Sequence, residues 1–263
     1  MYAKVPSRTQ RDYVVGVKGV SKIFHHGGKF GDMIFALYTM KALGGGQLVV
    51  SDYHGVNWNL AVARTMTSFL LAQPYIESVR TVPYIAAEVS QVDYDLQHAE
   101  DDKNPEAFPE WHGGSWPGNC NIRKRYAVHF GVEYDPEAVW LTAPQTKDVD
   151  VAVHIPSHRI VRTAVEWCEI LDGLSGLKVM VLGAEGCLGT NSLLESADHI
   201  NSAKVFLGVV SSCNALAEGL GKRRLVEQAD GCDNVNVGGK MGLSINSLSN
   251  QEVIEMVETC CAV

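Results

Sequence analysis

The chain has 263 residues, of which 46% are apolar and 20% charged, a composition that is typical of folded globular proteins and disfavours disorder. Its formal net charge of −8 argues against a large basic surface, although a local basic cleft stays open. No apolar run approaches the ~18 residues of a spanning helix, and the first residues lack the apolar core of a signal peptide. The seven cysteines include no CxxC pair, so we expect a cytoplasmic protein with reduced thiols, without a disulfide framework or a zinc site.

Residues 21–52 carry the pattern of a strand, a glycine loop, a helix and a second strand. Segment 21–24 can close a strand, HHGGKFGD supplies three glycines, 33–43 repeats apolar residues at helical spacing, and 47–50 is an apolar strand. The loop therefore follows the carboxyl end of a strand, which is where ligands bind in parallel sheets. Asp32 stands at the start of the helix, where it can cap backbone N–H groups or act on a ligand.

The remainder of the first half keeps the same alternation. We expect a helix over 58–73, strands over 79–82 and 92–96, and a helix over 121–130 with Asn121 as its cap. Between them, residues 100–119 form a long polar loop rich in Pro and Gly. Its Trp111, His112 and Trp116 could form a stacking surface for a sugar or a base, or they could simply anchor the loop to the body of the protein.

A polar segment at 141–150 separates the two halves, and an α/β pattern begins again after it. The expected elements are strands over 151–155, 178–182, 205–210 and 224–226, helices over 161–171 and 214–220, and a final helix that begins at the capping box Ser249/Glu252. Alternating strands and helices in both halves predict an α/β protein with two Rossmann-like, doubly wound domains facing a cleft. We place the domains at residues 1–147 and 148–263.

The motifs argue against several enzyme classes. The glycine loop reads GGKFG, which fits neither GxGxxG nor the P-loop, and HExxH and GxSxG are absent. The nine histidines do not gather at metal-ligand spacing, so we expect no metal site.

Two strand-end segments of the second half are candidate anion sites. HIPSHR at 154–159 and SSCNALAEGLG at 211–221 both follow strands, so hydroxyls, arginines and helix N–H groups can meet a diphosphate there. The serines could equally be helix caps, and the arginines could belong to a solvated surface. The predicted donor-binding residues are Ser157, His158, Arg159, Arg162, Gly183, Ser211, Ser212 and Asn214.

Two stretches resemble a known family. GGKFGDMIFALYTMKALGGGQLVV is similar to the amino-terminal signature of heptosyltransferase-like (family 9) glycosyltransferases of GT-B fold, and VFLGVVSSCNALAEGLGKRRLV is similar to their carboxyl-half segment. The family's usual pattern of Asp-Ser-Gly and then His reads Ser211, Ser212, Cys213 and Asn214 here, and the chain is shorter than typical members.

The resemblance implies an inverting, metal-independent transfer from a nucleotide-sugar. It assigns the acceptor to the first domain and the donor to the second, with Asp32 at the family's Gly-Asp position as the base. The predicted acceptor-binding residues are His26, Lys29, Trp111, His112 and Trp116. No cofactor is expected, because the nucleotide-sugar is a co-substrate.

The identity of the acceptor stays open at this point. A glycan, a lipid-linked sugar or a small molecule would suit the resemblance, and a nucleic acid, as in viral DNA glucosyltransferases, is disfavoured by 22 basic against 30 acidic residues. A third alternative is a protein that binds a nucleotide-sugar without turnover.

Overall fold

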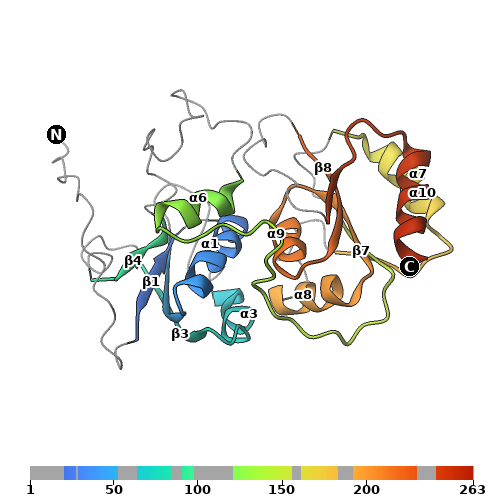
Figure 1. Ribbon diagram of the computed structural model, residues 1–263. Helices are drawn as coiled ribbons and strands as arrows, with labels where there is room; N and C mark the ends of the chain where they lie inside the picture. The colour runs from blue at the N-terminus through green and yellow to red at the C-terminus, as the bar shows by residue number, and fades with distance from the viewer. Residues whose placement is uncertain are drawn as a thin grey trace.

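The computed structural model of the chain describes residues 21–27, 29–52, 64–83, 91–97, 121–155, 161–182, 192–229 and 241–262 (Figure 1). The described residues of the first half form strands and helices in the order β1 (Ile23–His26), α1 (Phe30–Ala42), β2 (Gly46–Ser51), α3 (Thr67–Leu71), β3 (Ile76–Val82), β4 (Tyr94–Asp95) and α6 (Ile122–His129). Those of the second half follow as β5 (Val151–His154), α7 (Ala164–Gly173), β6 (Val179–Val181), α8 (Leu193–Ser202), β7 (Val205–Val209), α9 (Ser212–Gly219), β8 (Arg223–Glu227), β9 (Gly242–Ser244) and α10 (Asn250–Cys261).

The two halves contribute separate sheets whose described strand pairs are all parallel. The first sheet has the order β3-β2-β1-β4, and the second has the order β6-β5-β7-β8-β9. These are the two common doubly wound arrangements, and in each the strand order reverses at one switch point. The switch points lie between β1 and β4 in the first sheet and between β5 and β7 in the second. Ligands of doubly wound proteins bind outside the carboxyl ends of the strands at such points.

Most predicted elements are confirmed to within a few residues. Asn121 caps α6 by accepting a hydrogen bond from the Arg123 backbone, and the capping box of Ser249 and Glu252 opens α10. Two elements were missed, α8 and the short edge strand β9. α8 carried the same signal as α10, because Ser192 caps it and Glu195 follows three residues later.

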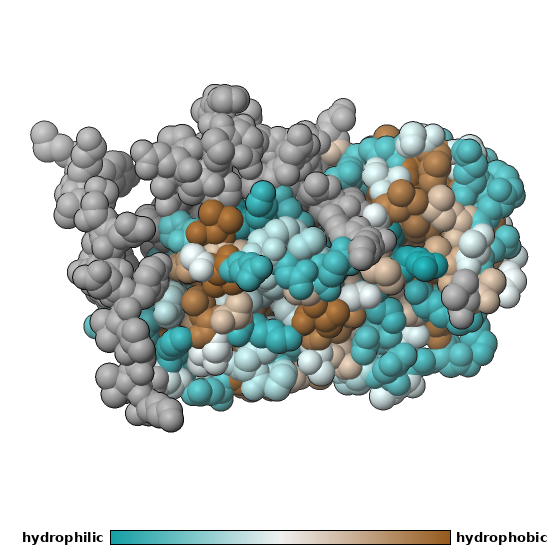
Figure 2. All heavy atoms as spheres, viewed as in Figure 1, coloured by the Kyte–Doolittle hydropathy of each residue, from teal (hydrophilic) through white to brown (hydrophobic). Residues whose placement is uncertain are grey.

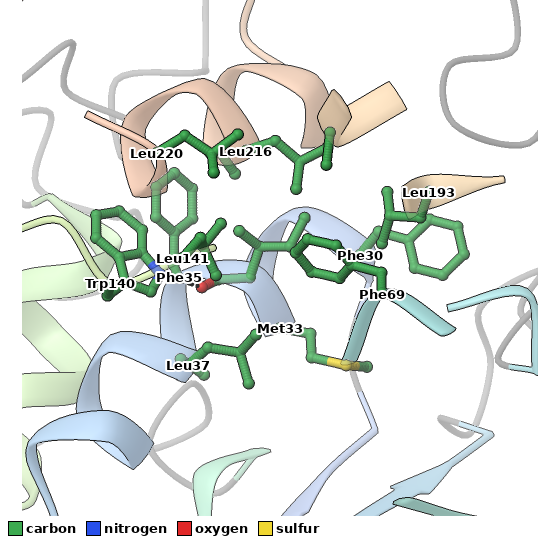
Figure 3. Close-up of a cluster of buried hydrophobic side chains, with 14 of the residues drawn as sticks. Phe30, Met33, Phe35, Leu37, Phe69, Trp140, Leu141, Leu193, Leu216 and Leu220 are labelled. Carbon is green, nitrogen blue, oxygen red and sulfur yellow. Dashed lines mark hydrogen bonds between the residues drawn. The ribbon is translucent and has the colours of Figure 1, made fainter. Parts of the chain in front are cut away.

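Helices fill the space between the two sheets. Figure 1 shows α1 and α9 side by side in the middle of the molecule, with α7 and α10 on the far side of the second sheet. Figure 3 shows the apolar side chains between these middle helices, including Phe30 and Phe35 of α1, Leu216 of α9 and Leu220 directly after α9. On the surface viewed in Figure 2, apolar side chains form small groups among polar ones.

One apolar cluster runs through both halves. It contains Phe24 and Leu48 of the first sheet together with Ala152 and Phe206 of the second. A large apolar interface restricts relative motion between units. The boundary at residues 147/148 therefore stays a prediction: the sheets are distinct, but their cores are joined. No helix or strand occurs in residues 130–150, which we call the connecting segment.

Candidate functional site: two helix starts at one junction

The first switch point brings polar side chains from three strands together. Nδ1 of His25 lies 2.8 Å from Oδ1 of Asp95, and Nε2 of His25 lies 2.8 Å from Oγ of Ser51. Since a carboxylate only accepts, Nδ1 of His25 carries the proton and donates it to Asp95. These contacts join the carboxyl ends of β1, β2 and β4, and no local sequence pattern predicts them.

Ser51, His25 and Asp95 are the residue types of a nucleophilic triad, yet their exposure is reversed from what such chemistry needs. Ser51 is fully buried and His25 is 1% exposed, whereas the side chain of Asp95 is 31% exposed. A nucleophile must be reachable by its substrate. The group is therefore a brace that fixes three strand ends.

His26, a predicted acceptor contact, is completely buried. Its Nε2 lies 3.2 Å from the Tyr126 hydroxyl of α6. Burial, reinforced by the neighbouring His25 and opposed by Asp95, lowers the pKa of His26 from 6.5 to about 3. His26 is therefore neutral at physiological pH and packs against α6, and its role in acceptor binding stays a prediction.

The second switch point carries a histidine and two hydroxyls. Nδ1 of His154, at the carboxyl end of β5, lies 3.0 Å from Oγ of Ser211, which follows β7. Ser211 is the N-cap of α9, where its Oγ accepts a hydrogen bond from the Asn214 backbone N–H, and Ser212 is the first helical residue. The capping role considered for these serines is confirmed for Ser211. A cap also leaves the remaining first-turn N–H groups of α9 directed at the switch point.

The side chains of Asn214 and Arg162 are engaged inside the second half. Oδ1 of Asn214 accepts a hydrogen bond of 3.2 Å from Arg224. Arg162 pairs with Glu227 at 3.0 Å and also donates to the carbonyls of Ile245 and Leu248. Arg162 is only 7% exposed, so the alternative of a solvated surface arginine is wrong for it. Its guanidinium joins the start of α7 to β8 and to the segment before α10.

The starts of α1 and α9 meet. A Cβ built on Gly31 would lie 3.7 Å from Cα of Ser212 and 3.8 Å from its backbone nitrogen. At the end of α9, the Gly219 carbonyl accepts the N–H groups of Trp140 and Leu141. The Trp140 ring in turn lies 6.0 Å from the ring of Tyr38, in the second half of α1. The two helices thus run side by side in the same direction. Both positive helix ends point to one junction, which favours an anion there.

Asp32 lies at this junction, one residue after Gly31. It is the third residue of α1 and partly exposed, while Lys29 is the N-cap and is exposed. The predicted acceptor residues Trp111, His112 and Trp116 and the predicted donor residues Ser157, His158, Arg159 and Gly183 lie outside the described residues. Of the predicted site residues that are described, Asp32, Lys29, Ser211 and Ser212 belong to one junction.

Within the described ranges, no cluster of three or more His, Cys, Asp or Glu side chains could hold a metal ion. None of the described helices is long and apolar enough to span a bilayer.

Two Rossmann-like units, with the starts of α1 and α9 meeting at one junction, define a GT-B-like fold. Solved structures with this fold include the glycosyl transferase family 9 protein from Veillonella parvula DSM 2008, with a TM-score of 0.61, 12% identity, and coverage of 92% of this chain and 97% of that chain. E. coli ADP-heptose lps heptosyltransferase II gives a TM-score of 0.58 at 10% identity, covering 92% of this chain and 98% of that chain. E. coli heptosyltransferase WaaC with ADP-2-deoxy-2-fluoro heptose gives 0.55 at 14% identity, covering 90% and 98%.

No family model and no curated protein matches the sequence. At these low identities the structural likeness concerns the fold. The predicted fold class is confirmed, and the resemblance to heptosyltransferases read from the two short sequence stretches holds at the level of the fold.

Proposed function

We propose that this chain is a glycosyltransferase that moves a sugar from a nucleotide-sugar to a hydroxyl acceptor. The observation that carries the proposal is the contact between Gly31 and Ser212. It brings the first turn of α1, to which Asp32 belongs, close to the helix start of α9 in the second half. A base for the acceptor and a cradle for the leaving diphosphate are the two groups that this reaction requires.

In the proposed reaction, the acceptor oxygen attacks the anomeric carbon of the donor sugar. Its proton passes to the Asp32 carboxylate, and the bond between the anomeric carbon and the phosphate oxygen breaks. The nucleoside diphosphate leaves with the electron pair, and attack from the opposite face inverts the anomeric carbon. In this proposal the acceptor binds to the first half, which carries Asp32, and the donor binds to the second half.

The leaving diphosphate would lie at the second switch point. The first-turn N–H groups of α9 and the hydroxyls of Ser211 and Ser212 can stabilise its charge. Arg159, five residues after His154 in the sequence, is a predicted further contact. Preorganised donors of this kind suit a transfer that does not require a metal ion. Metal independence is therefore part of the proposal.

The donor class to test first is an ADP-sugar. Two of the structural neighbours are described with ADP-heptose or an ADP-heptose analogue, and they share the fold over nearly their whole length. A ligand present at a hundredfold its dissociation constant adds about 2.7 kcal/mol to the free energy of unfolding. A thermal-shift panel of ADP-, UDP-, GDP- and CMP-sugars will therefore identify the nucleotide.

The decisive measurement is sugar transfer. The assay combines the donor found in the panel with a set of glycan, lipid-linked and small-molecule acceptors. We expect release of the nucleoside diphosphate together with a glycosylated product, at a rate that EDTA does not change. A protein that binds the donor but releases no nucleotide with any acceptor would be a binding protein, and the proposal would be wrong.

A further inference from the structure

A buried arginine of the first half contacts elements of both halves. Arg123 of α6 is fully buried, and its Nε lies 3.2 Å from Oε1 of Glu218 on α9. Its Nη1 and Nη2 donate to the carbonyls of Asp135 and Pro136 in the connecting segment, at 2.8 and 2.9 Å. A single guanidinium thus reaches α9 of the second half and the segment that joins the halves.

Three aromatic rings surround the same guanidinium. Its Cζ lies 4.9 Å from the ring centroid of Tyr38 on α1, 4.8 Å from that of Tyr134 and 4.6 Å from that of Trp140. Cations within about 6 Å of a ring centroid are attracted to the ring face, and the attraction grows when the pair is desolvated. The rings therefore favour a planar, charged side chain at this position and fix it relative to α1.

Glu218 is also held from its own half. Its Oε2 lies 2.9 Å from Nη1 of Arg224 on β8, and the same Nη1 donates to Oδ1 of Asn214 in the first turn of α9. The last turn of α9 is therefore bound to two partners: Arg224 within the second half and Arg123 across the interface. Loss of Arg123 leaves α9 attached to its own sheet but removes its ion pair with α6 and, with it, the link through the guanidinium to Tyr38 of α1.

We propose that Arg123 is a positioning residue for the transfer reaction: by fixing α9 against α1, it holds the donor end of the site over Asp32. The inference rests on the proposed function. A helix of eight residues moves nearly as a rigid rod, so a shift of Glu218 is passed to Ser212 about 9 Å away. Misplacement of reacting groups by about 1 Å can cost a factor of about 10² in rate.

The test compares Arg123→Met and Arg123→Lys with the wild type and with Lys124→Met, which removes an exposed charge from the next position of α6. We expect Arg123→Met to lower kcat per folded molecule by a factor of roughly 10 to 10². Nucleotide affinity should change less than about threefold, because Arg224 still holds Glu218. Arg123→Lys should lie in between, since an ammonium keeps the charge but lacks the planar fork. Lys124→Met should leave both quantities unchanged.

A double-mutant comparison asks whether Arg123 acts through Glu218. In a Glu218→Gln background, Arg123→Met should add little further loss of kcat, because residues that act as one unit are not additive. Unchanged kcat in both Arg123 variants would overturn the proposal. Additive effects, or a nucleotide affinity that falls in parallel with kcat, would also overturn it.

Hydrogen exchange separates this inference from the proposed function. In Arg123→Lys, the amides of α9 should exchange faster than in the wild type, whereas those of α10 should not change. This readout requires neither donor nor acceptor, so it holds even if no nucleotide binds and the proposed function fails. Equal protection of α9 in both proteins would overturn the positioning role, including in the case that Arg123→Met does not fold.

Discussion

At the first switch point the described polar groups at the strand and helix ends include three acids, Asp32, Asp52 and Asp95, beside two histidines and the buried hydroxyl of Ser51. At the second, the corresponding places are taken by His154 and the hydroxyls of Ser211 and Ser212. The backbone arrangement is the same in both, a parallel strand followed by a helix whose N-terminus points outward. The difference shows how one backbone design can serve two tasks, because acids suit proton removal and hydroxyls beside a helix start suit an anion.

The largest effect on activity should come from removing the Asp32 carboxylate at the first switch point. Asp32→Asn keeps the shape of the side chain but removes the base, so kcat should fall by a factor of roughly 10² to 10⁴ with nucleotide affinity unchanged. Asp52→Asn, the same substitution at the end of β2, is the matched control and should keep most of the activity. If Asp32→Asn transferred sugar at the wild-type rate, the two switch points would no longer differ in the way proposed.

Stability should depend on the buried cation Arg162 of the second half. Arg162→Met leaves the fully buried Glu227 without its ion-pair partner, and breaking a buried pair from one side costs about 3–5 kcal/mol of unfolding free energy. Urea unfolding monitored by circular dichroism measures this loss. Lys178→Met, which breaks the exposed pair with Asp148, should not change the midpoint measurably. A small loss for Arg162→Met would show that Glu227 is satisfied by the backbone N–H groups of residues 161 and 162 alone.

The pH dependence of stability should report on the first switch point. The pKa of His26 is about 3 in the folded protein against 6.5 for a free histidine, so the unfolded chain binds a proton that the folded one does not. The stabilisation is therefore complete above pH 6.5 and is lost as the pH falls toward 3, at up to about 1.4 kcal/mol per pH unit.

The matched variant is His26→Gln, which cannot titrate. Between pH 7 and pH 5, the wild type should lose about 2 kcal/mol more unfolding free energy than this variant. His25 and Asp95, which act electrostatically on His26, and Tyr126, which faces it from α6, are unchanged in the comparison. If the unfolding free energy of the two proteins depended equally on pH, His26 would take up a proton in the folded state as readily as in the unfolded chain.

The smallest effect is expected at the cap of α9. Ser211→Ala removes the hydrogen bonds to Asn214 and His154 and should cost about 1 kcal/mol of stability. Nucleotide affinity should fall roughly threefold to tenfold, because one donor to the phosphate is lost. Ser249→Ala removes the equivalent cap of α10, so it should cost a similar amount of stability and leave nucleotide affinity unchanged. Equal affinities in the two variants would assign Ser211 to capping alone.

The sequence by itself determined the features that depend on interactions between residues close together in the chain. Apolar spacing predicted the strands and helices on both sides of the connecting segment, and short-range hydrogen bonding predicted the caps at Asn121 and Ser249. The same rules would have located α8 from Ser192 and Glu195. The position of Asp32 at a strand-to-helix turn was readable too, because glycines and an apolar helical repeat mark such a turn within a few residues.

Tertiary structure alone decided how the two halves meet. The contact of Gly31 with Ser212 and the enclosure of Arg123 by Tyr38, Tyr134 and Trp140 join residues far apart in the chain. Nor does any local pattern separate Arg162, which is buried in an ion pair, from a solvated arginine. Burial and long-range pairing arise from packing the whole chain, so the charge state of His26 and the junction of α1 with α9 appear only once both sheets are folded against the same helices.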